Sequence, residues 1–217
     1  MTDFAAARRM MVDGQVRTAD VTDLRLLAAM SELPRERFVP EGKAELSYLD
    51  LDLPVTGGAS RYLLKPMVLA KLIQTAEIAA TDHVLDVGCA TGYSSALLAH
   101  LAASVVALEE EPSVSRTAER NLAQFPNAKV VAGKLALGWP PAGPYDVIVM
   151  QGATEIVPET LLAQLKNGGR LICVLGRGAQ RKATLFRNAD GEVGGRPMFD
   201  AAAPLLSGFV QAPAFVF

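Results

Sequence analysis

The sequence contains few of the residues from which metal centres, disulfide frameworks and nucleophilic triads are built. Its 217 residues include only two cysteines, Cys89 and Cys173, and two histidines, His83 and His100. The cysteines lie far apart without metal-ligand or disulfide spacing, so we expect no metal site and a reducing compartment. Both histidines are expected to be structural or exposed rather than catalytic.

An excess of charge of one sign is also missing. The 21 basic side chains nearly balance the 23 acidic ones, which gives a formal net charge of −2 at pH 7. Without a strong basic excess, the chain has no general electrostatic attraction for nucleic acid or an anionic membrane surface. We therefore expect neither of them as a partner.

Long hydrophobic runs are absent as well. The apolar stretch from Ala96 to Val106 is interrupted by His100 and Ser104, and it is too short to cross a bilayer. The first nine residues contain no apolar stretch of the length that a secretory signal needs. These features predict a cytoplasmic protein. Its 50 % hydrophobic and 20 % charged residues are enough to bury a core.

From His83 onwards, short apolar runs alternate with segments of helical pattern. The expected strands are residues 84–87, 104–109, 129–132, 145–150 and 170–175, and the expected helices are residues 93–101, 113–125 and 158–165. Because these strands do not alternate apolar with polar residues, they are expected to form a parallel sheet that is covered on both faces. Residues 183–187 and 193–199 are expected to add antiparallel edge strands.

The sequence therefore predicts one α/β domain with a doubly wound, mostly parallel Rossmann-like sheet. We divide it into residues 1–80, which form an N-terminal helical cap and a loop, residues 81–176, which form the ligand-binding core, and residues 177–217, which form antiparallel C-terminal edge strands.

The strongest local signal is the glycine-rich turn after the first expected strand. Gly88 and Gly92 let the chain turn sharply and let a ligand approach the backbone, with Cys89 and Ala90 between them. Ligands of open parallel sheets bind beyond the carboxyl ends of the strands. The alternative explanation is that the glycines only permit a tight strand-to-helix turn.

Glu109 ends the next expected strand, 17 residues after Gly92. An acidic side chain there can accept hydrogen bonds from both ribose hydroxyls of an adenosine. The alternative is a solvated charge run, because Glu110 and Glu111 follow. Only Glu109 lies at the strand tip, so we expect it to bind an adenosine-containing cofactor.

The glycine spacing discriminates between cofactors. Dinucleotide sites usually carry Gly-x-Gly-x-x-Gly, whereas here three residues separate Gly88 from Gly92, and Asp86 precedes both. The pattern Asp-x-Gly-x-x-x-Gly resembles the first motif of class I S-adenosylmethionine-dependent methyltransferases. That resemblance implies that Asp86 lies near the methionine ammonium, a charge pairing that a pyrophosphate site would not favour. A nicotinamide dehydrogenase is thus disfavoured.

Further segments, in order along the chain, resemble the protein-L-isoaspartate O-methyltransferase family. They are residues 11–21, 33–40, 84–93, 138–140, 144–146, 158–159 and 165–171. Members methylate the α-carboxylate of L-isoaspartyl residues in damaged proteins. The resemblance therefore implies S-adenosyl-L-methionine as cofactor and isoaspartyl proteins or peptides as partners. Because the acceptor carboxylate is already ionised and the reaction needs mainly alignment, the lack of a nucleophile triad is compatible with this chemistry.

The sequence departs from the family in the loop that carries its active-site serine. The family pattern Pro-Ile-Gly-x-Gly-Gln-Thr-Ile-Ser-x-Pro corresponds to residues 54–66, which are two residues longer and place Leu64 at the serine position. A leucine side chain cannot form a hydrogen bond. Ser60 and Thr56 are then the candidate catalytic hydroxyls, and Leu64 becomes a candidate cofactor contact.

A second departure follows the third expected strand. Where the family has Gly-Asp-Gly, with an aspartate that recognises the adenine amino group, this chain has Gly133-Lys134-Leu135. Lysine offers donors only, so it cannot accept from that amine. Lys134 and Leu135 remain candidate cofactor-binding residues, with adenine held by stacking, backbone contacts and the leucine side chain.

These departures leave alternatives open within the same fold. One is a methyltransferase with a different acceptor, and the other is a cofactor-binding homologue with little or no isoaspartyl activity. Arg61 and Lys65 flank the longer loop and could attract an anionic acceptor. The sequence favours the plainer interpretation that both are solvated loop cations.

Overall fold

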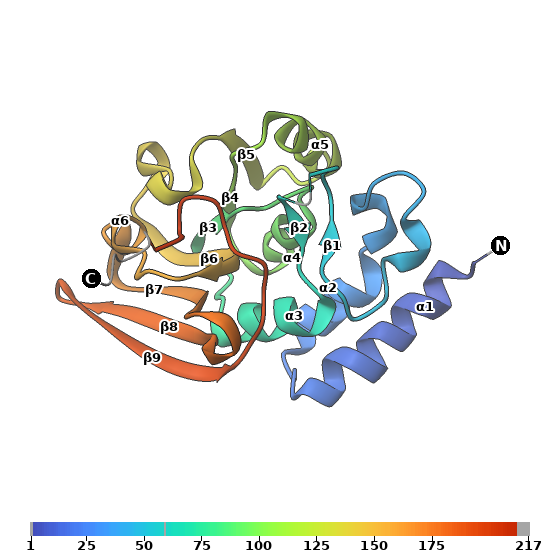
Figure 1. The fold of residues 1–217 in the computed structure, drawn as a ribbon, viewed down its shortest axis with the longest axis horizontal. Helices are drawn as coiled ribbons and strands as arrows, with labels where there is room; N and C mark the ends of the chain where they lie inside the picture. The colour runs from blue at the N-terminus through green and yellow to red at the C-terminus, as the bar shows by residue number, and fades with distance from the viewer. Residues whose placement is uncertain (1, 59, 212–217) are drawn as a thin grey trace, which may run out of the picture.

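The computed structural model describes residues 2–58 and 60–211. A seven-stranded sheet runs through the molecule in the order β5-β4-β3-β6-β7-β8-β9 (Figure 1). The strands are β3 (His83–Val87), β4 (Ser104–Glu109), β5 (Ala128–Ala132), β6 (Tyr145–Thr154), β7 (Leu165–Leu175), β8 (Lys182–Ala189) and β9 (Glu192–Asp200).

Strands β3 to β7 pair in parallel, and β8 and β9 join the sheet antiparallel at one edge. This confirms the predicted Rossmann-like sheet and its antiparallel C-terminal strands. The chain adds strands first on one side of β3 and then on the other, so the strand order reverses at β3. The carboxyl ends of β3 and β6 therefore border the crevice in which sheets of this type bind ligands, and the end of β4 lies on the other side of β3.

Helices cover the sheet and build the cap. The sheet is flanked by α3 (Pro66–Thr75), α4 (Tyr93–Leu101), α5 (Pro112–Leu122) and α6 (Glu159–Leu162), and the cap contains α1 (Phe4–Met11) and α2 (Leu24–Glu32). Proline stands at the first position of α3 and of α5, where its missing N–H costs nothing. The Asp23 carboxylate caps α2 by accepting the Arg25 N–H at 2.9 Å.

The two short strands β1 (Leu53–Pro54) and β2 (Tyr62–Leu63) form a separate antiparallel ribbon. This ribbon carries the longer loop that distinguishes the sequence, and it lies between the cap and the sheet in Figure 1. Because each strand has only two residues, few backbone hydrogen bonds hold the ribbon together.

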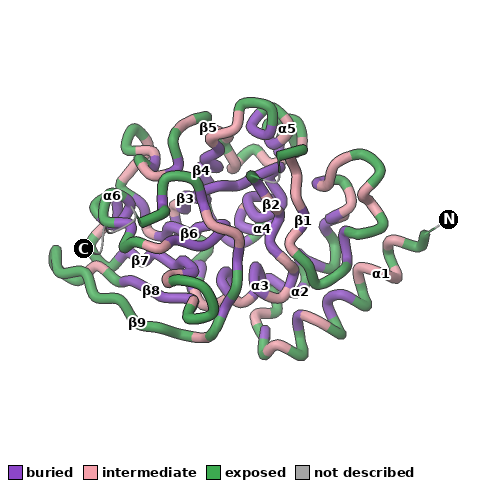
Figure 2. Tube along the Cα trace, in the orientation of Figure 1, coloured by how far each residue is buried: buried purple, intermediate pink, exposed green. Residues whose placement is uncertain are grey.

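The core follows the central strands, which are buried on both faces as their unalternated sequences predicted. Figure 2 shows β3, β4 and β6 almost wholly buried and β9 exposed along its length. Apolar residues of the cap, including Met11, Leu26 and Met30, belong to the same buried cluster as Val84 and Val105 of the sheet. The cap is thus a packed part of the molecule.

Several predicted elements differ in length from the observed ones. Strand β7 begins at Leu165, five residues before its predicted start, and α5 ends at Leu122 instead of residue 125. Helix α6 ends at Leu162 instead of residue 165, because Leu165 already pairs with Tyr145 in the sheet. Strand β6 continues to Thr154, four residues beyond the predicted end. Its last residues pair with Val174 and Leu175 of β7 and also contact residues 201–209. A parallel bridge joins Ala153 to Leu205, a contact across about fifty residues that local sequence does not reveal.

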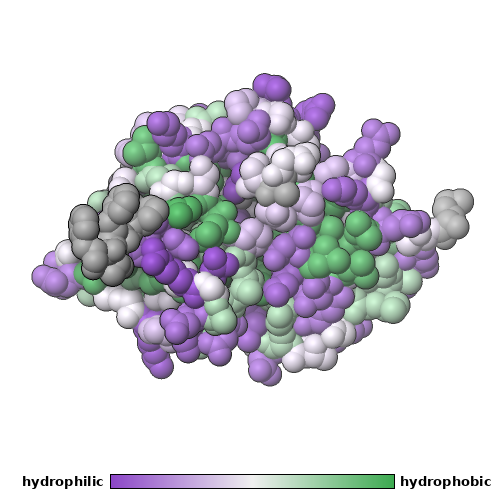
Figure 3. All heavy atoms as spheres, in the orientation of Figure 1, coloured by the Kyte–Doolittle hydropathy of each residue, from purple (hydrophilic) through white to green (hydrophobic). Residues whose placement is uncertain are grey.

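Hydrophilic groups cover most of the face in Figure 3, with apolar patches between them. In the described part of the chain, no helix combines the length and the apolar character needed to span a bilayer.

Candidate functional site

The glycine-rich turn joins the carboxyl end of β3 to α4. Gly88 and Gly92 have φ values of +80° and +97°, in the left-handed region that a glycine adopts without strain. The N–H groups of Gly88 and Cys89 both donate to the Leu108 carbonyl, at 2.8 and 3.1 Å. Ala90 shares the left-handed conformation, with φ at +51°, although it carries a Cβ. The turn is therefore fixed against the end of β4.

Asp86 lies beneath this turn and is fully buried. Its Oδ2 accepts the hydroxyls of Ser94 at 2.7 Å and Ser95 at 2.5 Å, and its Oδ1 accepts the Gln151 side-chain amide at 2.7 Å. Burial raises the pKa of Asp86, while these hydrogen bonds oppose the shift. The carboxylate predicted to meet a cationic group is thus already held by three neutral donors.

Glu109, at the end of β4, is fully buried and accepts five hydrogen bonds. Three come from backbone N–H groups, those of Ala90 at 2.8 Å, Glu110 at 2.9 Å and Glu111 at 3.1 Å. The other two come from Arg61, whose Nε and Nη2 lie 2.9 and 3.0 Å from Oε1 and Oε2. Because a carboxylate offers about four lone-pair positions, this one has no acceptor capacity left.

The interpretation of Arg61 as a solvated loop cation is wrong. Arg61 is 4 % exposed, and its guanidinium forms a bidentate ion pair with Glu109. It also lies against the glycine turn, because a Cβ built on Gly88 would come within 2.5 Å of Arg61 Nη2. Arg61 therefore occupies the position at which the sequence predicts a ligand to approach the backbone.

The segment 201–209, which we call the C-terminal strap, packs beside the end of β6 and the Gly88 turn. Leu206 donates its N–H to the Ala153 carbonyl at 2.9 Å, and Ala153 donates to the Pro204 carbonyl at 2.7 Å. The buried Leu206 side chain faces two glycines, since a Cβ on Gly152 or Gly88 would lie 2.7 or 3.3 Å from its Cδ2. The strap thus fills the space beside β6.

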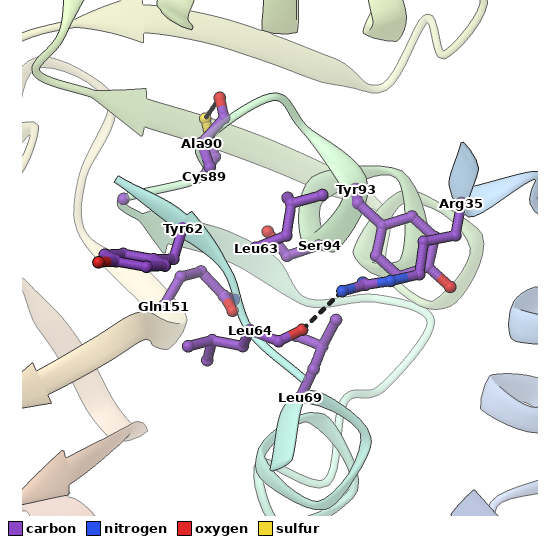
Figure 4. A pocket seen from close by; sticks show the side chains of 11 residues that line it. Arg35, Tyr62, Leu63, Leu64, Leu69, Cys89, Ala90, Tyr93, Ser94 and Gln151 are labelled. Atoms are coloured by element: carbon purple, nitrogen blue, oxygen red, sulfur yellow. Dashed lines mark hydrogen bonds between the residues drawn. The ribbon is translucent and has the colours of Figure 1, made fainter. Parts of the chain in front are cut away.

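Beside the glycine-rich turn, between β2, the Arg35 side chain and the start of α4, a cavity of only about 10 Å³ remains. Leu64, Gly88, Cys89, Ala90, Tyr93 and Gln151 are among its lining residues (Figure 4). A cavity of this size holds about one water molecule. The residue types at the strand ends suit an adenosine-containing cofactor, but this cavity, as folded, is far smaller than such a cofactor.

Arg35 lines the same cavity and is fully buried. Its Nε donates to the Ser47 carbonyl at 2.8 Å and its Nη2 to the Leu64 carbonyl at 2.9 Å. Figure 4 shows its guanidinium against the Tyr93 ring, with 4.7 Å between Cζ and the ring centroid. Burial lowers the pKa of Arg35. The sequence singled out neither Arg35 nor Tyr93 for a role in the site.

The candidate hydroxyls Ser60 and Thr56 lie at the tip of the longer loop, outside the cavity lining. Their side-chain oxygens are 3.2 Å apart, and Ser60 is exposed. Lys134 is also exposed, and Leu135 is buried in the apolar cluster behind β4. The roles of these four residues in catalysis or cofactor binding remain predictions. Leu64, by contrast, is buried and faces the cavity.

The remaining polar candidates take part in structural contacts. His83 Nδ1 lies 2.6 Å from the Ser104 hydroxyl, and His100 packs edge-on against Phe125. Burial raises the pKa of the Cys89 thiol well above its usual range and that of Cys173 to about 12. Across residues 2–58 and 60–211, no three side chains of histidine, cysteine, aspartate or glutamate converge as a metal site would require.

Comparisons with known proteins agree on one family. The family model for protein-L-isoaspartate(D-aspartate) O-methyltransferase matches residues 7–202. The chain is 39 % identical over 171 residues to a protein-L-isoaspartate O-methyltransferase of Methanoculleus marisnigri, which covers 78 % of this chain and 77 % of that protein. It is 36 % identical over 196 residues to protein-L-isoaspartate O-methyltransferase 1 of Rhodopseudomonas palustris, covering 88 % and 79 %.

Solved structures show the same fold. A protein-L-isoaspartate O-methyltransferase superposes with a TM-score of 0.80 at 26 % identity, over 93 % of this chain and 66 % of that one. This chain therefore spans slightly less than two thirds of that structure. A second, from Plasmodium falciparum and in complex with S-adenosyl-L-homocysteine, has a TM-score of 0.78 at 17 % identity, over 92 % and 98 %.

Proposed function

The chain belongs to the protein-L-isoaspartate O-methyltransferase family, and from that premise we propose that it methylates the α-carboxylate of L-isoaspartyl residues in damaged proteins or peptides. Enzymes of this family are S-adenosylmethionine-dependent methyltransferases. We also propose that the protein acts in the cytoplasm, where damaged intracellular proteins would be its substrates.

One observation carries the proposal. Two buried carboxylates, Asp86 and Glu109, stand at the carboxyl ends of adjacent parallel strands, with the left-handed Gly88 turn between them. This arrangement lies at the point where the strand order reverses, and it falls within the 7–202 match to the family. These strand-end features favour a class I methyltransferase cofactor site, and their place within the family match favours the isoaspartyl acceptor.

The residues around the cavity would support such a reaction by positioning and by excluding water. Arg35 holds the loop in place through the Leu64 carbonyl, at 2.9 Å. Leu63, Leu64 and Leu69 give the cavity apolar walls, and a carboxylate nucleophile reacts faster where it is desolvated and aligned. Because the acceptor is ionised at neutral pH, no general base is required.

The test is methyl transfer to a defined peptide. We expect the protein, supplied with methyl-labelled S-adenosylmethionine, to form a methyl ester on a peptide with one L-isoaspartyl residue. The same peptide with ordinary aspartate is the control and should remain unlabelled. Labelling of neither peptide by protein that binds the cofactor would contradict the proposed substrate.

A different acceptor is the second candidate, favoured by the loop. Leu64 is buried at the position where the family carries its serine, and the hydroxyls of Ser60 and Thr56 bond to one another instead of facing the cavity. An acceptor that needs no hydrogen bond from this loop would suit the observed lining. Label transferred to another class of acceptor but not to the isoaspartyl peptide would favour this candidate.

A further inference from the structure

The cofactor site of this chain is closed by the chain itself. The Arg61 guanidinium makes two hydrogen bonds to Glu109, at 2.9 and 3.0 Å, and lies against the backbone of Gly88. We propose that Arg61 is an internal competitor for the cofactor, so that the Arg61–Glu109 pair must open before an adenosine ribose can reach Glu109. This inference rests on the proposed function, because it assumes that the site takes S-adenosylmethionine.

The hydrogen-bond capacity of Glu109 requires this competition. Three of its five donors are the backbone N–H groups of Ala90, Glu110 and Glu111, which belong to the fixed turn and to the end of β4. Only the two donors of Arg61 can leave without unfolding the sheet. Two ribose hydroxyls would need the acceptor positions that those two donors now fill.

Arg61 belongs to a segment, the β1–β2 ribbon and its loop, that few backbone hydrogen bonds hold in place. Arg61 directly precedes β2, and the ribbon of β1 and β2 has only two residues in each strand. Beyond it, a hydrogen bond of 2.9 Å joins the Val55 N–H to the Arg61 carbonyl. Gly57 and Gly58 at the loop tip are exposed and have open space around their Cα atoms. With so few backbone hydrogen bonds, the ribbon itself adds little to the cost of opening, which is set mainly by the Arg61–Glu109 pair.

The exchange of partners favours the closed form. A bidentate pair between a guanidinium and a carboxylate is charge-assisted, and such hydrogen bonds are stronger than those from neutral hydroxyls. A cofactor would have to replace the two hydrogen bonds from Arg61 with hydrogen bonds from its ribose hydroxyls. Its apparent affinity is therefore reduced by the fraction of molecules in which Arg61 has left Glu109.

The C-terminal strap reinforces the closed form. The Leu206 side chain lies against Gly88 and Gly152, next to the place where Arg61 meets Gly88, and the strap is bonded to Ala153 at 2.7 and 2.9 Å. Shortening this side chain should open the same site without changing any charge. Leu206 thus provides a second, uncharged way to test the closure.

Titration calorimetry with S-adenosyl-L-homocysteine tests the proposal directly. We expect Arg61→Ala to bind this ligand more tightly than the wild type by about tenfold or more, because the ligand no longer has to displace the guanidinium from Glu109. Leu206→Ala should also bind more tightly. Arg187→Ala, which removes an arginine paired with Glu77 at the far edge of the sheet, is the matched control and should leave the affinity unchanged.

Equal affinity of the wild type and a folded Arg61→Ala variant would overturn the competition and leave the proposed function standing. Absence of binding in every folded variant would overturn both. If Arg61→Ala does not fold, hydrogen exchange on the wild type decides. Saturating S-adenosyl-L-homocysteine should then speed exchange at the amides of Val55 and Leu206, and bound ligand with unchanged or slower exchange at both would contradict the proposal.

Discussion

Glu109→Gln is expected to lower the free energy of unfolding by about 3–5 kcal/mol, which is the usual cost of removing one partner from a buried ion pair. The substitution leaves the buried Arg61 cation without its carboxylate. It also turns one acceptor oxygen into an amide nitrogen, although all five groups around Glu109 are donors. Chemical denaturation monitored by circular dichroism measures the loss.

The exposed Glu192 in β9 provides the control, because Glu192→Gln should change stability by less than about 0.5 kcal/mol. Adding Arg61→Met to Glu109→Gln removes the unpaired cation and should restore part of the loss, so that the two substitutions are not additive. A loss of less than about 1 kcal/mol for Glu109→Gln would mean that the pair is solvated in solution, contrary to its observed burial.

Leu64→Ser is expected to raise methyl transfer to an isoaspartyl peptide by about 10- to 100-fold in kcat/KM. That range corresponds to a hydrogen bond to a charged group, worth about 1.5–3 kcal/mol. The substitution places a hydroxyl in the cavity beside the Gln151 side chain. Initial rates with labelled cofactor, at several peptide concentrations, give the comparison with the wild type.

The matched control is Leu64→Ala, which opens the same space without adding a hydroxyl. Both variants should lose about 2–4 kcal/mol of stability, because Leu64 is a buried side chain in contact with the core. Only the serine variant should gain activity. Equal activity of the two variants would show that added space, and not a hydrogen bond, limits the reaction at this position.

Much of the fold could be predicted because its signals are local. The apolar runs of β3 and β4, the proline at the start of α3 and the left-handed Gly88 turn each carry their structure in a few neighbouring residues. The ends of strands and helices could not be predicted where residues far away in the sequence determine them. Strand β6 continues to Thr154 because its last residues pair with β7 and also bridge to the strap, which comes about fifty residues later.

The same division applies to the site. Asp86 and Glu109 could be placed at strand ends from the motif alone, since parallel strands bring their carboxyl ends to one edge. The partner of Glu109 could not, because Arg61 stands 48 residues earlier in a loop rich in glycine. Nothing in that loop indicates burial. A glutamate at the end of a buried strand nevertheless requires a cationic or hydrogen-bonding partner. This requirement is the one sequence signal that points to a buried arginine beside Glu109.

A crystal structure of the protein with S-adenosyl-L-homocysteine tests the central claim most directly. We expect Glu109 to accept hydrogen bonds from the ribose hydroxyls and Arg61 to have moved away from it, with the Leu206 side chain displaced from Gly88. A bound ligand in this crevice with the Arg61–Glu109 pair still intact would contradict the account.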